Sequence, residues 1–74
     1  MSTSVEADEL ERCILDLLHE GLDDAAIARR LGVGHRTVQR RVRGLMERWQ
    51  VVGRVALGAR AQEFGLLKRS DRAA

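Results

Sequence analysis

Apolar residues recur at helical spacing in four stretches of the chain, and glycines separate these stretches. In the first stretch, from about Asp8 to Glu20, apolar residues return every three or four positions, at Leu10, Cys13, Ile14, Leu17 and Leu18. This spacing puts them on one face of a helix. We expect Asp8 to cap that helix, with Glu11 as its reciprocal partner, and Gly21 to end it.

The second and third stretches predict two more helices, at about Asp24–Leu31 and His35–Trp49, joined by a short turn. Asp23 is the expected cap of the second helix, and Gly32 is expected to end it. The third helix has no capping side chain before it, because Gly34 occupies that position. Its apolar residues form one stripe, consisting of Val38, Val42, Leu45, Met46 and Trp49.

A fourth helix is predicted from about Arg54 to Leu67, with Leu57, Ala61 and Phe64 in one apolar row. The whole pattern predicts an all-α fold, a four-helix bundle that contains a helix-turn-helix. We expect one folded domain over residues 8–67, with flexible tails at 1–7 and 68–74.

Composition narrows the range of functions. A chain of 74 residues has little room for a deep pocket beside its core, and no nucleophile, base and orienting group come together, so no catalytic residue and no enzyme are expected. Cys13 is the single cysteine and no zinc-type spacing occurs, so no metal site and no cofactor are expected either. Without a long apolar run or a signal peptide, the expected location is cytoplasmic, with no membrane contact. Twelve arginines against one lysine suggest a GC-rich bacterial genome.

Charge is divided sharply along the chain. Residues 1–24 carry eight acids and one base, whereas residues 25–49 carry seven arginines and one acid, Glu47. An arginine-rich segment of this kind favours a polyanion such as double-stranded DNA as partner. The acidic first helix is expected to face away from that partner, or to bind a protein such as RNA polymerase.

The residues between the second and third helices fit the requirements of a helix-turn-helix. A small residue, Ala28, lets the two helices approach, and Gly32 four positions later permits a tight turn. The apolar residues that would seal the corner are Ile27, Leu31, Val33 and Val38.

The polar face of the third helix carries the side chains that recognise base edges. Arginine pairs with guanine and glutamine pairs with adenine in the major groove. Residues near the helix N-terminus reach deepest, which predicts Gln39, Arg40 and Arg43 as base-reading residues. The expected phosphate contacts are Arg36, Thr37, Arg41 and His35.

Residues 20–42, which include Thr37-Val38-Gln39 and the small buried pair Ile27-Ala28, resemble the LuxR-type (GerE or FixJ) helix-turn-helix domain. The resemblance covers roughly residues 8–67 and implies a bacterial transcription regulator, such as the output domain of a response regulator. It also implies a third helix in the major groove and a fourth helix that forms a homodimer, for which Ala59 and Leu66 are the candidate residues. An N-terminal sensing domain is a further implied partner. The sequence departs from the family at Gly34, Ala26 and the Trp49-Gln50 pair.

Two alternative functions remain open at this point. The fourth region of a sigma factor has a similar helix-turn-helix and would bind RNA polymerase as well as DNA. A helical protein-interaction module without DNA binding would instead use the acidic first helix and the fourth helix.

Overall fold

The computed structural model describes residues 7–67, which contain four α-helices and no strand. The helices are α1 (Glu9–His19), α2 (Asp24–Leu31), α3 (His35–Trp49) and α4 (Arg54–Glu63). The all-α fold expected from the hydrophobic pattern is thereby confirmed. Apart from Ala7, the tails expected at 1–7 and 68–74 lie outside the described residues. None of the described helices has the length and apolar character that crossing a membrane requires.

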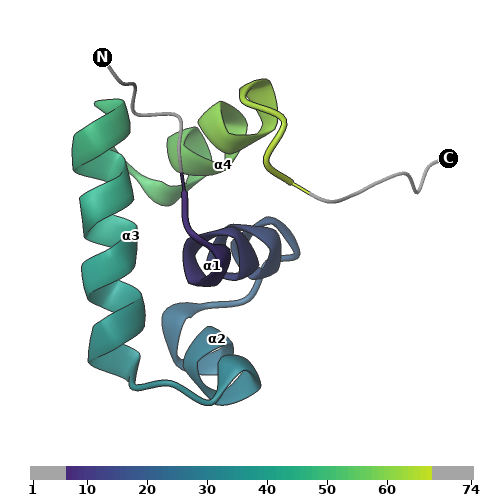
Figure 1. The fold of residues 1–74 in the computed structure, drawn as a ribbon, viewed down its shortest axis with the longest axis vertical. Coiled ribbons are helices and arrows are strands. Elements are labelled where there is room, and N and C mark those ends of the chain that lie inside the picture. The colour runs from purple at the N-terminus through teal and green to yellow at the C-terminus, as the bar shows by residue number, and fades with distance from the viewer. Residues whose placement is uncertain (1–6, 68–74) are drawn as a thin grey trace, which may run out of the picture.

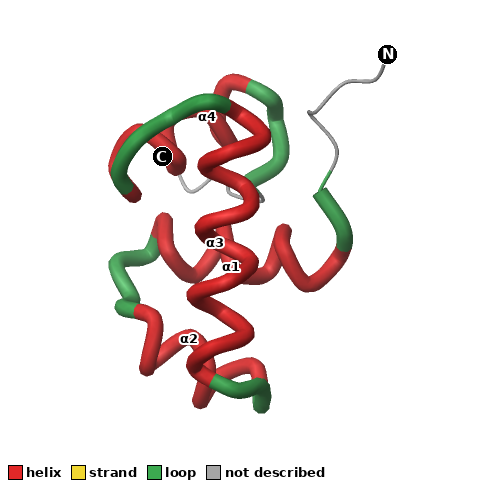
Figure 2. The backbone as a smooth tube through the Cα atoms, turned by 90° about the vertical axis from the view of Figure 1, so that its left-hand side faces the viewer, coloured by secondary structure: helices red, strands yellow, loops and turns green. Residues whose placement is uncertain are grey.

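Helix α3 lies along one side of the molecule, with the other three helices on its inner side (Figure 1). It packs against α1, α2 and α4, and α1 in turn packs against α2 and α4. In the perpendicular view, α3 runs in front of the other helices and no described segment covers it (Figure 2). This arrangement leaves one long face of α3 open.

The helix starts follow from local hydrogen bonds. The Glu11 backbone N–H donates to the Asp8 carboxylate at 2.8 Å, and the Asp8 N–H donates to the Glu11 carboxylate at 3.1 Å, which makes the predicted capping box. Asp23 accepts from the Ala26 N–H at 2.9 Å and caps α2 as predicted.

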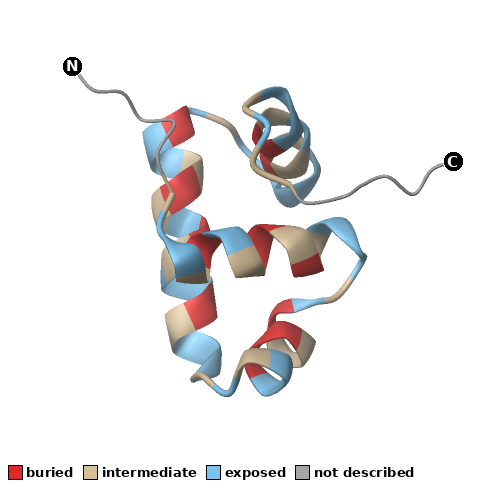
Figure 3. Cartoon of the chain, turned by 45° about the vertical axis from the view of Figure 1, so that its right-hand side comes forward, coloured by how far each residue is buried: buried red, intermediate tan, exposed pale blue. Residues whose placement is uncertain are grey.

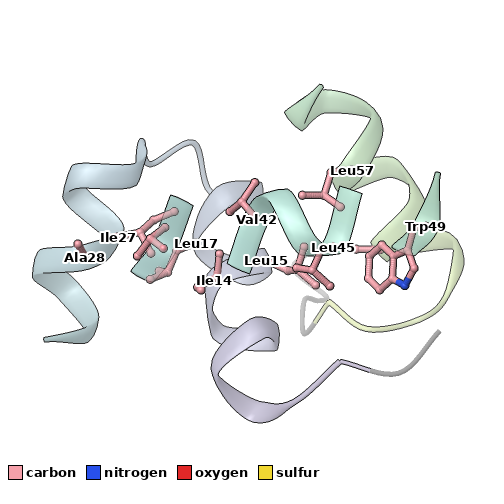
Figure 4. Close-up of a cluster of buried hydrophobic side chains, with 11 residues drawn as sticks. Ile14, Leu15, Leu17, Ile27, Ala28, Val42, Leu45, Trp49 and Leu57 are labelled. Atoms are coloured by element: carbon pink, nitrogen blue, oxygen red, sulfur yellow. The ribbon is translucent and has the colours of Figure 1, made fainter. Parts of the chain in front are cut away.

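Residues from all four helices form a single elongated core (Figure 4). Its fully buried side chains are Ile14, Leu15, Ile27, Val38, Val42, Leu45 and Leu57. Leu15 was absent from the apolar face predicted for α1, whereas Leu10, Cys13 and Leu18 are only half-buried. The reason is that α1 lies between α2 and α4, so its buried surface is wider than one stripe.

The corner between α2 and α3 has the predicted helix-turn-helix form. Gly32 takes a left-handed conformation, with φ at 70°, and Val33 N–H donates to the Ala28 carbonyl at 3.0 Å. This bond closes the C-terminus of α2 and turns the chain within three residues. Ala28 and Val38 both belong to the buried core, with exposures of 6% and 0%.

The fourth helix ends at Glu63, and the prediction that it continues to Leu67 was wrong. Gly65 takes φ of 71°, and the Leu66 N–H donates to the Ala61 carbonyl at 3.0 Å, which closes the helix end. Leu66 and Leu67 then pack against the core. Leu66, which was predicted as a dimer contact on the fourth helix, therefore lies beyond that helix and is half-buried.

Helix α3 ends at Trp49, and the next residue, Gln50, is a non-glycine residue in the left-handed region, with φ at 57° and ψ at 47°. The Arg60 guanidinium donates to the Trp49 carbonyl at 3.2 Å and so satisfies one of the last carbonyls of α3. Phe64 packs edge-on against the Trp49 ring, with centroids 5.1 Å apart. These contacts fix α4 to the end of α3.

We expect Gln50→Gly to stabilise the protein. A left-handed backbone costs a side-chain-bearing residue about 1–2 kcal/mol, whereas glycine adopts it freely, so the net gain after the entropy cost of glycine is about 0.5–1 kcal/mol. Thermal unfolding by circular dichroism measures the change. Gln39→Gly, the same replacement at an exposed position inside α3, should instead lower stability. Lower stability for both variants would contradict this interpretation of Gln50.

Candidate nucleic-acid interface

Figure 3 shows that α3 is exposed along its outer side and buried along its inner side. The residues of the exposed side are polar or charged. Val38, Val42, Leu45 and Trp49 point into the core, with exposures of 3% or less. The exposed residues on the other side are Arg36, Gln39, Arg40, Arg43 and Glu47. At about 100° per residue, Arg36, Arg40 and Arg43 fall within about 60° of one another on the helix surface. The fold thus presents three arginines and one glutamine side by side on the face of α3 that no other described segment covers.

These arginines are also electrostatically uncompensated. In the part of the chain that the structure describes, no carboxylate pairs with Arg36, Arg40 or Arg43. Their guanidinium groups are therefore available to an anionic ligand or to base edges.

The N-terminus of α3 adds a second source of positive potential. Its cap, Gly34, offers no side-chain acceptor, and the first turn holds no acidic residue. The first backbone N–H groups of a helix point outward and carry the positive end of the helix dipole, so this end suits a phosphate. His35 and Arg36 are exposed there, and Thr37 is half-buried.

Arg41 was predicted as a phosphate contact, but its side chain is turned toward α1. Its Nη1 atom lies 2.5 Å from Asp8 Oδ2 and 3.5 Å from Glu11 Oε2. The Glu11 backbone N–H, and after it the Arg41 guanidinium, lower the pKa of the Asp8 carboxyl below its ordinary value. The Asp8 carboxylate in turn raises the pKa of Arg41.

Arg48 joins the same group of charges, with Nη2 3.0 Å from Glu11 Oε1. The Glu11 side chain is 8% exposed, so this carboxylate is buried between two arginines of α3. Sequence reasoning missed these ion pairs, because it treated the acidic first helix as a surface that faces away from the arginines. The available signal was the spacing of Arg41 and Arg48, which are seven residues and therefore two helical turns apart on one side of α3.

A second long-range ion pair ties the start of α4 to the start of α2. Arg54 Nη2 lies 2.7 Å from Asp24 Oδ2, and the Asp24 side chain is 10% exposed.

The exposed side of α4 carries a small apolar strip. Val55 is 90% exposed, and Ala59 is exposed one turn later. Within residues 7–67, no group of His, Cys, Asp and Glu side chains could hold a metal ion.

Comparison with known proteins agrees with this geometry. Residues 6–48, more than half of the chain, match the homeodomain-like domain family. Over 64 residues, 86% of this chain, the sequence is 42% identical to a bialaphos biosynthetic pathway regulatory protein from Streptomyces hygroscopicus. The chain spans 25% of the length of that relative. No solved structure gives a significant match. The family match covers α1, α2 and nearly all of α3, and the chain belongs to the homeodomain-like family of helix-turn-helix domains, which bind DNA.

Proposed function

We propose that this chain binds double-stranded DNA in a sequence-specific manner as the DNA-binding part of a bacterial transcription regulator, with α3 in the major groove. The observation that carries the proposal is the exposed face of α3, where Arg36, Arg40 and Arg43 lie together without carboxylate partners. A major groove about 12 Å wide admits one helix with one buried face and one polar face. The helix-turn-helix family and the relative named as a regulatory protein together support a role in transcription regulation.

Within this proposal, Gln39, Arg40 and Arg43 read base edges. All three are exposed and lie in the first nine residues of α3, the half of a recognition helix that reaches deepest. Arginine can make two hydrogen bonds to guanine, and glutamine can make two to adenine. These three side chains would therefore supply most of the discrimination between sites.

The phosphate contacts come from the N-terminus of α3. His35 and Arg36 are exposed there, and the Thr37 hydroxyl lies in the same turn as the free backbone N–H groups. Arg41 would join this set only by leaving the carboxylates of Asp8 and Glu11. We therefore assign the phosphate contacts to His35, Arg36 and Thr37 first.

We further propose that the domain is of the LuxR type and that it acts as a homodimer through α4. Ala59 and the neighbouring Val55 are exposed on that helix and could meet the same strip of a second copy. Two linked copies on an inverted repeat gain affinity through effective concentration, which a domain with this little surface needs. In analytical ultracentrifugation, we expect the mass of the DNA complex to correspond to two chains on one duplex. Ala59→Glu should disrupt the dimer and lower that mass toward one chain for each duplex.

The experiment that tests the function is a salt series with labelled duplex DNA, using both random duplex and a pool selected for binding. Each neutralised phosphate contributes about −0.9 to the slope of log affinity against log salt, so we expect a slope of roughly −2 to −4 per chain. The selected pool should also converge on one half-site. Absence of binding at low salt would overturn the proposal and favour a protein-interaction module. Stable binding to RNA polymerase without DNA would favour the sigma-factor alternative.

A further inference from the structure

The five arginines of α3 fall into two groups with different surroundings. Arg36, Arg40 and Arg43 lie on the open face and have no carboxylate partner in the described chain. Arg41 and Arg48 lie on the side toward α1, and both contact the Glu11 carboxylate, at 3.5 and 3.0 Å. The cationic helix therefore offers DNA fewer charges than its sequence suggests.

The carboxylates that contact Arg41 and Arg48 are held in place by the start of α1. The Glu11 side chain is 8% exposed, and its carboxylate also accepts the Asp8 backbone N–H at 3.1 Å, so its position is fixed by the start of α1. Asp8 adds a second acceptor for Arg41 at 2.5 Å, and this carboxylate is itself held by the Glu11 N–H at 2.8 Å. Charge-assisted hydrogen bonds of this kind are about twice as strong as neutral ones. A phosphate would have to displace two such contacts to recruit Arg41, and the contact with Glu11 to recruit Arg48.

We propose that Asp8 and Glu11 raise the specificity of DNA binding, by keeping Arg41 and Arg48 away from the DNA backbone. The inference rests on the proposed DNA-binding function. Non-specific affinity depends on how many phosphates the protein neutralises, whereas discrimination depends on base contacts. Arg41 and Arg48 point more than about 90° away from the centre of the Arg36–Arg43 stripe, at about 100° per residue. When base contacts fix α3 in the groove, these two arginines reach few phosphates.

A non-specific complex has no such base contacts to fix the helix. If Arg41 and Arg48 were released from α1, α3 could rotate toward the phosphate backbone of the DNA. The protein would then bind DNA of any sequence more tightly. By withholding them, Asp8 and Glu11 lower the affinity for random DNA more than the affinity for the target. The ratio between the two affinities, which governs site selection in a genome, is raised in consequence.

The double variant Asp8→Asn, Glu11→Gln tests this proposal. Asparagine caps helices as well as aspartate does, and glutamine serves in the capping box, so the start of α1 is retained while both charges are removed. The matched control is Glu9→Gln, Glu20→Gln, which removes two charges from exposed positions in and beside α1 that contact no α3 arginine in the structure. Asp8→Asn alone serves as a milder variant, and circular dichroism confirms that each protein is folded.

We expect the double variant to bind random duplex about 3- to 10-fold more tightly than the control at low salt, with a salt slope steeper by about 1–2. The affinity for the selected duplex should change less than about 2-fold. Asp8→Asn alone should also raise the affinity for random duplex, but by a smaller factor than the double variant. Random-duplex affinity and slope equal to those of the control would overturn the inference and leave the proposed function intact. An equal gain on both duplexes would also overturn it, because specificity would be unchanged. A wild-type chain that binds no DNA would overturn both.

Discussion

Replacing Arg40 with alanine is expected to weaken binding to the selected duplex by about 5- to 150-fold, which corresponds to the 1–3 kcal/mol of one good bidentate base contact. Arg40 lies at the centre of the exposed stripe, one turn from both Arg36 and Arg43. Because Arg40 has no carboxylate partner in the described chain, its replacement breaks no ion pair there. The loss should therefore appear in DNA binding and not in protein stability.

The comparison that decides the role of Arg40 is the loss on random duplex. Loss of a base-reading residue lowers the affinity for the selected site far more than the affinity for random DNA. Loss of a phosphate contact lowers both affinities by the same factor and reduces the salt slope by about 1. Arg12→Ala is the matched control, since Arg12 is an exposed arginine on α1. Equal losses on the two duplexes would show that Arg40 binds phosphate, and would remove it from the base-reading set.

The second large effect concerns Trp49, and Trp49→Ala is expected to cost about 3–5 kcal/mol of the free energy of unfolding. Trp49 is 3% exposed and packs edge-on against Phe64, so it joins the end of α3 to the residues that follow α4. A small domain has a total stability near the lower end of about 5–15 kcal/mol, so this variant should be largely unfolded on mild heating.

Trp49→Phe keeps an aromatic ring in the core position that Trp49 occupies, so it should lose clearly less stability than Trp49→Ala. Val52→Ala is the surface control, because Val52 is 92% exposed and its truncation should change stability by less than about 0.5 kcal/mol. Chemical denaturation followed by circular dichroism measures all three variants. A small effect of Trp49→Ala would contradict the packing of α4 described here and would leave the helix-turn-helix as the main stable unit.

Most of the fold could be predicted from local signals in the sequence. The bounds of α2 and the start of α3 follow from the Asp23 cap and the glycines at 32 and 34, and the structure confirms them. The same kind of signal was overlooked at Gly65, where a left-handed glycine ends α4 earlier than the apolar pattern suggested. The left-handed turn at Gln50 carries no such signal, because glutamine gives no local preference for it.

The candidate site was predictable only in part, for a physical reason. Amphipathic periodicity places Arg36, Gln39, Arg40 and Arg43 opposite the apolar stripe of α3, and the structure does expose them. The surroundings of Arg41 depend on where α1 crosses α3, and residues 30 or more positions apart in sequence make that contact. A charge pattern along the chain cannot distinguish attraction between two helices from segregation onto two faces, so the ion pairs required the tertiary arrangement.

The central claim is that the open face of α3 contacts DNA, and the most direct measurement is a nuclear magnetic resonance titration of isotope-labelled protein with the selected duplex. We expect the largest shifts at the backbone amides of residues 35–43 and at the side chains of Arg36, Arg40 and Arg43. The amides of α1 and of the exposed Val52 should move little, and shifts in α4 should be confined to the proposed dimer strip at Val55 and Ala59. Shifts concentrated on α1 or α4, with the N-terminal half of α3 unchanged, would contradict the claim.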